Sequence, residues 1–192
     1  MKKSTRKVLL AVLCVAAIVT ASVFATLAYF TDTQTVTNTF TVGNVSITMD
    51  EAKVTEYGEE IPGADRVMEN SYKLIPGQTY VKDPTIHVAR GSEACWLFVK
   101  VENGLAPVES TIAAQLARIG WVPVAGETNV YVYPVYATAG DYPVFGSFTV
   151  DENADADALN AVKDASIVIT AYAVQAAGLD TVEEAWAAAK NA

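Results

Sequence analysis

An uninterrupted apolar run opens the chain. Residues 8–28 contain no charged side chain, and 21 residues suffice for a helix to cross a ~30 Å hydrocarbon core. Four basic residues precede the run: Lys2, Lys3, Arg6 and Lys7. A basic end, an apolar stretch and a small residue at the junction form the layout of an export signal, so we predict a signal peptide at 1–28, cut between Ala28 and Tyr29. A retained N-terminal membrane helix is the alternative, because the run exceeds the usual ~7–15 residues.

Strict alternation begins directly after this junction. Thr occupies every odd position from 31 to 41, and a period of two is typical of a β-strand. Gly43-Asn44 permits a turn, after which Val45, Ile47 and Met49 resume an apolar face. The strand face opposite the threonines carries Phe30, Asp32, Gln34, Val36, Asn38, Phe40 and Val42.

The rest of the chain reads as short strands separated by turn signals. We predict a loop with a weak hairpin over 50–70, a helix between Pro107 and Gly120 capped by Ser110 or Thr111, and a helical turn near Leu159. A capping box at Thr181 predicts a C-terminal helix over about 181–190. Strands are predicted at 80–82, 85–89, 94–102, 121–124, 130–137, 145–150 and 166–175.

This pattern predicts one mainly β domain over residues 29–192. Antiparallel strands with few helices are typical of a β-sandwich or jelly roll. The strand at 94–102 is apolar on both faces and is therefore expected at the centre. The N-terminal signal or transmembrane helix would precede this domain.

Charge narrows the classes of partner. Of the 13 Lys and Arg residues, four lie in the leader, so nine basic and 22 acidic residues remain, a formal net charge of −13. Nucleic acid and anionic membranes are bound through clustered Lys or Arg. We therefore expect no nucleic-acid partner and membrane contact only through the leader.

Residues able to carry catalysis are scarce. His87 is the only histidine, which excludes a two-His zinc motif, and its place between Ile86 and Val88 favours a structural role. Cys95 is the only cysteine after the leader. No intramolecular disulfide is then possible, and the apolar stretch that follows predicts a small buried side chain. No cofactor is expected.

One acidic loop has two interpretations. Its carboxylates are close enough in sequence to hold calcium outside the cell, yet the spacing matches no EF-hand loop. A solvated loop is the alternative. The calcium candidates are Asp151, Asp155 and Asp157, with Glu152 beside them.

Three segments carry a family resemblance. Residues 26–33 with 38–43, then 73–79, and finally 169–175 with Trp186, resemble Gram-positive proteins whose leaders are cut by a SipW-type signal peptidase, including the TasA and camelysin (CalY) biofilm-matrix proteins. The resemblance implies a secreted jelly-roll subunit that assembles into extracellular fibres, with the SipW-type peptidase as a processing partner. It also implies that the strand at 29–42 can pair with the next subunit's sheet. Camelysin's metallopeptidase activity is not carried over, because this chain lacks the histidine ligands.

Three functions remain from the sequence. The first is a non-enzymatic structural protein of the cell surface or biofilm matrix of a Gram-positive-type bacterium, polymerising through residues 29–42; that strand pairing within its own sheet is the competing structural interpretation. The second is a monomeric surface binding module or adhesin, retained by an uncleaved anchor or free, with Tyr131, Tyr133 and Tyr136 as candidate contacts. An enzyme, the third, would need a pocket that joins His87 to two carboxylates.

Overall fold

The computed structural model describes residues 44–191. The predicted leader, the cleavage site at Ala28 and Tyr29, and the face from Phe30 to Val42 lie outside this range. The strands are β1 (Ile47–Asp50), β2 (Thr79–Val81), β3 (Thr85–Val88), β4 (Cys95–Asn103), β5 (Val122–Pro123), β6 (Val130–Val132), β7 (Gly140–Pro143), β8 (Ser147–Thr149) and β9 (Ile167–Gln175). The helices are α2 (Ile112–Ile119), α3 (Ala156–Ala161) and α4 (Val182–Ala189).

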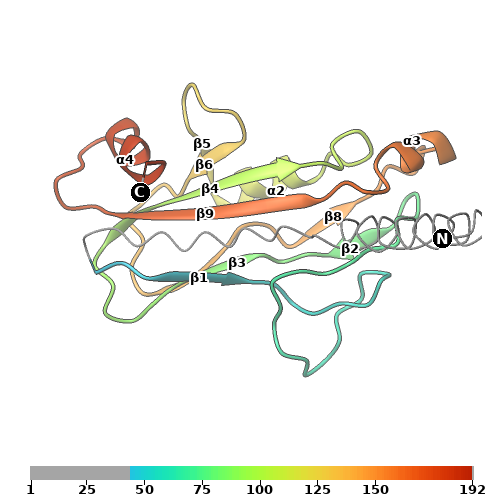
Figure 1. Ribbon diagram of the computed structural model, residues 1–192, viewed down its shortest axis with the longest axis horizontal. Coiled ribbons are helices and arrows are strands. Elements are labelled where there is room, and N and C mark those ends of the chain that lie inside the picture. Colours follow the sequence, from blue (N-terminus) through green and yellow to red (C-terminus); the bar gives the residue numbers. More distant parts are fainter. Residues whose placement is uncertain (1–43, 192) are drawn as a thin grey trace, which may run out of the picture. The chain divides into compact units, whose positions relative to one another are not determined.

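Two antiparallel layers face each other (Figure 1). The first layer contains β1 paired with β3, β3 paired with β7, and β2 paired with β8. The last two pairs form one long ribbon, because Lys82 N–H donates to Gly146 O (3.3 Å) and Val144 N–H donates to Pro84 O (2.9 Å) between them. The second layer has the order β5-β6-β4-β9. The predicted mainly β, antiparallel architecture is therefore confirmed, while jelly-roll connectivity stays a prediction.

The central strand β4 packs on both faces, as its sequence predicts. Leu97 and Val99 point into the main core between the layers, together with Cys95. Phe98 points the other way, into a second cluster that includes Trp186 of α4. Burying a large apolar side chain contributes about 1.5–3 kcal/mol, so β4 anchors both the sandwich and its C-terminal helix.

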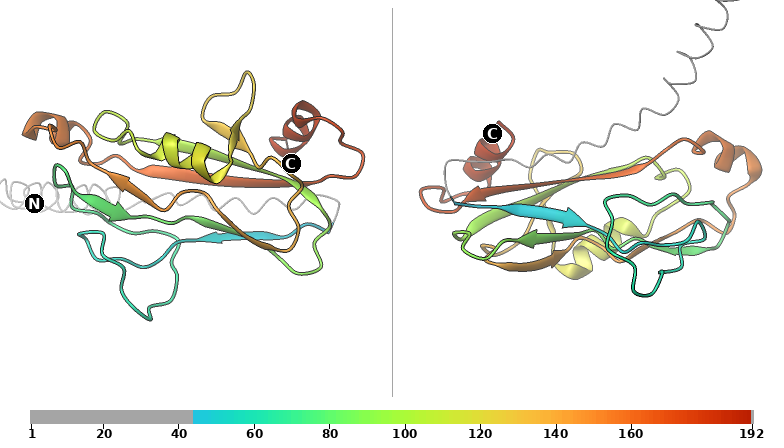
Figure 2. Two further views of the ribbon diagram at one scale, coloured as in Figure 1. Left: turned by 180° about the vertical axis from the view of Figure 1, so that it is seen from behind. Right: turned by 60° about the horizontal axis from the view of Figure 1, so that its bottom comes forward.

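Helix α2 closes one side of the sandwich. It buries Ile112 and Leu116 in the main core, and Gln115 Nε2 donates to Ser147 O (2.6 Å) on the neighbouring β8. Seen from behind, α2 covers the space between the layers (Figure 2, left). The helix ends at Gly120, whose φ of 111° suits a residue without a Cβ.

The start of α2 corrects a sequence prediction. Thr111 holds the cap position but makes no side-chain cap bond. The Glu109 carboxylate accepts instead from the Thr111 N–H and from the Ile112 N–H (3.0 Å for the latter). Glu109 is 5% exposed, and a buried carboxylate needs such donors to offset its desolvation.

Other elements match their patterns with two differences. Helices α3 and α4 form where predicted, and the capping box of Thr181 with Glu184 is present. The 50–70 loop holds only isolated bridges, one of them joining Val54 and Glu60. Strand β6 is much shorter than the predicted 130–137, and β7 was not predicted at all.

Candidate functional site: open strand edges and a polar network

The long strand β9 leaves one edge unpaired. Leu97 O accepts from Tyr133 N–H on the β6 side of β4, whereas Ala94 O accepts from Ala176 N–H on the β9 side. Because backbone groups alternate along an antiparallel ladder, even-numbered residues of β9 bond to β4 and odd-numbered residues point outward. Within residues 44–191, β4 is the only strand that pairs with β9. The outward backbone groups belong to Ile167, Ile169, Ala171, Ala173 and Gln175.

Strand β1 has a second open edge. Ala89 N–H donates to Ser46 O (2.9 Å), so the even-numbered residues of β1 bond to β3. The backbone groups of Ile47 and Met49 then point away from β3. Among residues 44–191, no backbone group pairs with those of Ile47 and Met49. Pairing on this edge starts only after the end of β1, where Glu51 exchanges hydrogen bonds of 2.7 and 2.8 Å with Val67.

Both open edges lie on the side of the sandwich opposite α2 (Figure 1; Figure 2, right). The residues with free backbone groups are also those whose side chains line the main core, among them Ile47, Ala171 and Ala173. An additional strand on this side would thus gain backbone hydrogen bonds and core contacts together.

The described chain begins at one end of this open side. Glu93 N–H donates to Asn44 O (3.0 Å), and the Glu93 carboxylate accepts from the Gln175 side chain at the end of β9. Asn44 is therefore tethered next to the C-terminal end of the β9 edge.

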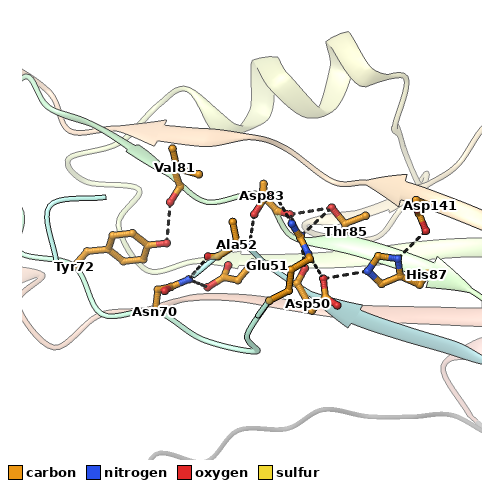
Figure 3. Close-up of polar contacts among 11 residues, drawn as sticks. Asp50, Glu51, Ala52, Asn70, Tyr72, Val81, Asp83, Thr85, His87 and Asp141 are labelled. Atoms are coloured by element: carbon orange, nitrogen blue, oxygen red, sulfur yellow. Dashed lines mark hydrogen bonds and ion pairs between the residues drawn. The ribbon is translucent and has the colours of Figure 1, made fainter. Parts of the chain in front are cut away.

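A polar network ties β1, β3 and β7 of the first layer together on their outer face (Figure 3). His87 of β3 lies between two carboxylates: its Nδ1 is 2.7 Å from Asp141 Oδ1 and its Nε2 is 3.0 Å from Asp50 Oδ1. Arg66 also pairs with Asp50, and its Nη1 is 2.8 Å from Asp83 Oδ2. Residues from β1, β3 and β7 are thus linked through one imidazole.

The network favours a charged imidazole. Partial burial alone would lower the pKa of His87, but the hydrogen bonds to Asp141 and Asp50 outweigh it and the pKa is raised above 6.5. Burial likewise opposes ionisation of Asp50, yet its bonds to Arg66 and His87 lower its pKa. Both ring nitrogens are occupied, so His87 has no free nitrogen with which to act as a base.

His87 therefore meets two carboxylates, as the enzyme interpretation would need, but both of its ring nitrogens are taken up by them. The hydroxyl of Thr85, which belongs to the network, donates to Asp83 O (2.9 Å). Between residues 44 and 191, no group of three or more His, Cys, Asp and Glu side chains is arranged to hold a metal ion. What the arrangement can do is join strands.

A second polar cluster is buried beside this network. Lys82 Nζ is 2.6 Å from Glu51 Oε2, and their side chains are only 10% and 4% exposed. Asn70 Nδ2 donates to Glu51 Oε1 (2.9 Å) and to Ala52 O (2.8 Å). Asn70 Oδ1 in turn accepts from Val54 N–H (2.9 Å).

Sequence reasoning missed this cluster, although a signal was present. Glu51 continues the odd-numbered apolar series of Val45, Ile47 and Met49, and Lys82 follows Tyr80 at the same period of two. A charged residue in a core-facing position must find a buried partner. That rule pairs Glu51 with Lys82, but it does not find Asn70.

The calcium candidates lie around α3. Asp155 caps the helix by accepting from Ala158 N–H (2.8 Å), and Asp151 Oδ1 accepts from Asn153 N–H (2.8 Å). Asp157 is exposed in the first turn. Two of the three carboxylates thus serve the loop itself, and calcium binding there stays a prediction.

The three candidate tyrosines have different environments. Tyr131 lines a half-open cavity of about 240 Å³ between β4 and α2. Tyr133 packs edge-on against Trp121 and Tyr142. Only Tyr136, 49% exposed, offers a substantial free surface.

Cys95 is a core residue, as predicted. Its side chain is fully buried in the main cluster, and its Sγ lies 3.6 Å from Ala137 O. Burial raises the pKa of the Cys95 thiol to about 11. A thiol of that kind is a poor nucleophile at neutral pH.

Comparison with known proteins gives one match. Residues 1–81 match a family described as camelysin metallo-endopeptidase, which confirms the resemblance to the camelysin-like family over that part of the chain. No curated protein and no solved structure matches. None of the helices between residues 44 and 191 is long and apolar enough to cross a membrane.

The family description implies a catalytic metal ion such as zinc, but the residues of this chain do not fit a zinc peptidase site. Zinc peptidase sites use three protein ligands, commonly two histidines and a carboxylate. This chain has one histidine, and its ring nitrogens face the carboxylates of Asp141 and Asp50, the second of which also pairs with Arg66. We derive no hydrolytic step for these residues.

Proposed function

We propose that this chain is a secreted, non-enzymatic structural protein of the cell surface or biofilm matrix, which polymerises by inserting residues 29–42 of one molecule at the open edges of the next. The family match supports an extracellular or cell-surface location. A SipW-type signal peptidase would release the donor strand by cutting after Ala28. Residues 29–192 would then form the secreted domain.

The observation that carries the proposal is the outer edge of β9. Natural edge strands are usually short or guarded by charged residues or proline. Strand β9 spans nine residues with neither, so its free edge is a template for another strand. The side chains of Ala171 and Ala173 on this strand belong to the main core, so an incoming strand would pair next to core residues.

A competing arrangement fills the same edges from within. A turn at Gly43-Asn44 would fold residues 29–42 back onto β1 of the same molecule, antiparallel to it. The two arrangements predict different oligomers, because only transfer to a neighbour builds a chain of subunits. A monomer at every concentration would instead favour the surface binding module, in which Tyr136 is the exposed candidate contact.

Deletion of residues 29–38 from the secreted form tests the proposal. We expect a folded monomer by circular dichroism and size-exclusion chromatography, whereas the undeleted form makes concentration-dependent large assemblies. Fibres formed by the protein that lacks residues 29–38 would contradict the donor-strand proposal.

A substitution on the receiving edge gives a matched test. Ala171→Pro removes an outward N–H without touching the bonds to β4, since proline is tolerated where the N–H faces away from the ladder. Ala171→Ser keeps the N–H and serves as its control. We expect assembly to be lost with proline and kept with serine, in proteins that remain equally folded as monomers.

A further inference from the structure

Three polar side chains, the buried Glu51 and Lys82 and the half-buried Asn70, converge at the junction of β1, the 51–78 loop and β2. The Glu51 carboxylate bonds to an amine through one oxygen, Lys82 Nζ at 2.6 Å, and to an amide through the other, Asn70 Nδ2 at 2.9 Å. Glu51 therefore bridges an amine and a carboxamide side chain (Figure 3 draws Glu51 and Asn70).

Aromatic rings shield this cluster from water. Lys82 Nζ lies 5.9 Å from the centre of the Tyr72 ring, and Tyr72 packs edge-on against both Tyr80 and Phe148. Burial, with the nearby Glu51 and Asp83 carboxylates, raises the pKa of Tyr72 and keeps its phenol neutral. The phenol hydrogen is committed to Val81 O (3.0 Å).

The carboxamide is held as an acyl acceptor. Val54 N–H donates to Asn70 Oδ1 at 2.9 Å, so a backbone donor already points at the oxygen that would gain negative charge if Cγ were attacked. Ala52 O and Glu51 fix the orientation of the Asn70 Nδ2 group. The Lys82 amine and the Asn70 carboxamide are thus held on the two oxygens of the Glu51 carboxylate, which can carry protons between them. Such positioning favours an intramolecular reaction.

We propose that Lys82 and Asn70 form an intramolecular isopeptide bond, with Glu51 as the proton carrier. Nothing in the assembly proposal above is needed for this reaction. The product would be a covalent link between the 51–78 loop and the end of β2.

The chemistry balances without a cofactor or an oxidant. A proton passes along the 2.6 Å contact from Nζ to Glu51 Oε2, leaving a neutral amine whose lone pair attacks Asn70 Cγ. Glu51 returns this proton to Nδ2 and removes a second one from Nζ. The Cγ–Nδ2 bond then breaks, a secondary amide remains, and ammonia leaves with the proton that Glu51 holds.

Intact mass measurement of the purified full chain, under denaturing conditions, is the primary test. We expect a mass lower than the sequence mass by one ammonia molecule, and one branched peptide containing both Asn70 and Lys82 after protease digestion. A full mass, or a lowered mass with Lys82 still cleavable by trypsin, would overturn the proposal; the second result would indicate cyclisation of an asparagine elsewhere.

Variants separate the roles of the three residues. Glu51→Gln and Lys82→Arg should both keep the full mass while retaining the wild-type circular dichroism spectrum. Lys53→Arg, an exposed lysine of the same segment, is the control and should still lose ammonia. Loss of ammonia in Lys82→Arg would exclude Lys82 as the nucleophile.

If either cluster variant fails to fold, the wild-type peptide map alone decides the matter. A folded Glu51→Gln protein that forms the link as fast as wild type would remove Glu51 from the reaction.

Discussion

At the scale of single residues, His87 links three strands on the outer face of the first layer. It joins Asp50 of β1 to Asp141 of β7 from its own position on β3. A neutral imidazole carries one N–H and can donate to only one of these carboxylates, whereas the charged form donates to both. Protonation of one ring therefore decides whether the three strands share a polar link.

Stability should depend on pH through this residue. Because the pKa of His87 is raised above 6.5, its contribution is complete below about pH 6.5 and is lost as the pH rises through the raised value. The effect should be about 1 kcal/mol or less, since the partners are partly solvated. We expect His87→Gln to lower the unfolding free energy at about pH 6 and to leave it unchanged at about pH 9.

Urea denaturation of both proteins at the two pH values measures this difference. As the chain has one histidine, its NMR titration gives the pKa directly. A pKa at or below 6.5, or an equal loss at both pH values, would contradict the interpretation.

Sequence reasoning placed His87 on a strand but did not find its partners. Asp50, Arg66, Asp83 and Asp141 are spread over about half of the chain, and no spacing rule connects them. Their proximity arises from the pairing of β1 and β7 on either side of β3. Side-chain networks of this kind follow from sheet order, which a single sequence does not contain.

At the scale of elements, α4 shows how a local signal succeeds. Thr181 and Glu184 predict a capping box, and both of its bonds form: Glu184 N–H donates to Thr181 Oγ1 (3.3 Å), and Thr181 N–H donates to Glu184 Oε2 (3.2 Å). The helix thereby places Ala185 and Trp186 in the second apolar cluster, which also contains Phe98 of β4.

Removing the cap should loosen α4 without unfolding the sandwich. Thr181→Ala deletes the side-chain acceptor and should cost about 1 kcal/mol. Amide hydrogen exchange should accelerate in residues 182–189, while the amides of β4 keep their protection. Thr181→Ser retains the hydroxyl and should behave as wild type; equal acceleration with serine would mean that the methyl group, rather than the bond, matters.

Elements without a local signal were the ones that sequence reasoning missed. Strand β7 consists of Gly140, Asp141, Tyr142 and Pro143, and Gly, Asp and Pro are all depleted in strands. It forms because it continues the ribbon of β8 along β3. At the N-terminus of α2 the predicted residue Thr111 holds the cap position, but the side chain of Glu109 accepts the capping hydrogen bonds, a contact that the usual cap preference does not include.

At the scale of the whole molecule, charge opposes association. The secreted domain would carry a formal net charge of −13, and like-charged subunits repel over distances comparable to the Debye length. That length is about 10 Å at 0.1 M salt and about 30 Å at 0.01 M. Backbone pairing at an open edge must therefore overcome a repulsion that salt weakens.

Assembly of the secreted form should accelerate with ionic strength. We expect faster growth of light scattering at about 0.5 M sodium chloride than at about 0.02 M, because screening acts on repulsion while strand pairing is little affected. Sodium sulfate at equal ionic strength controls for effects specific to chloride. Fastest assembly at the lowest salt would indicate that attractive ion pairs drive association.

The long pairing of β4 with β9 also has a mechanical consequence. Nine residue pairs join the two strands along the length of the sandwich. Tension applied along the strands would load these backbone bonds simultaneously, in shear, rather than one after another as in unzipping. A strand bound along the free edge of β9 would share that geometry, so a fibre built this way would resist being pulled along its axis more strongly than being peeled apart from the side.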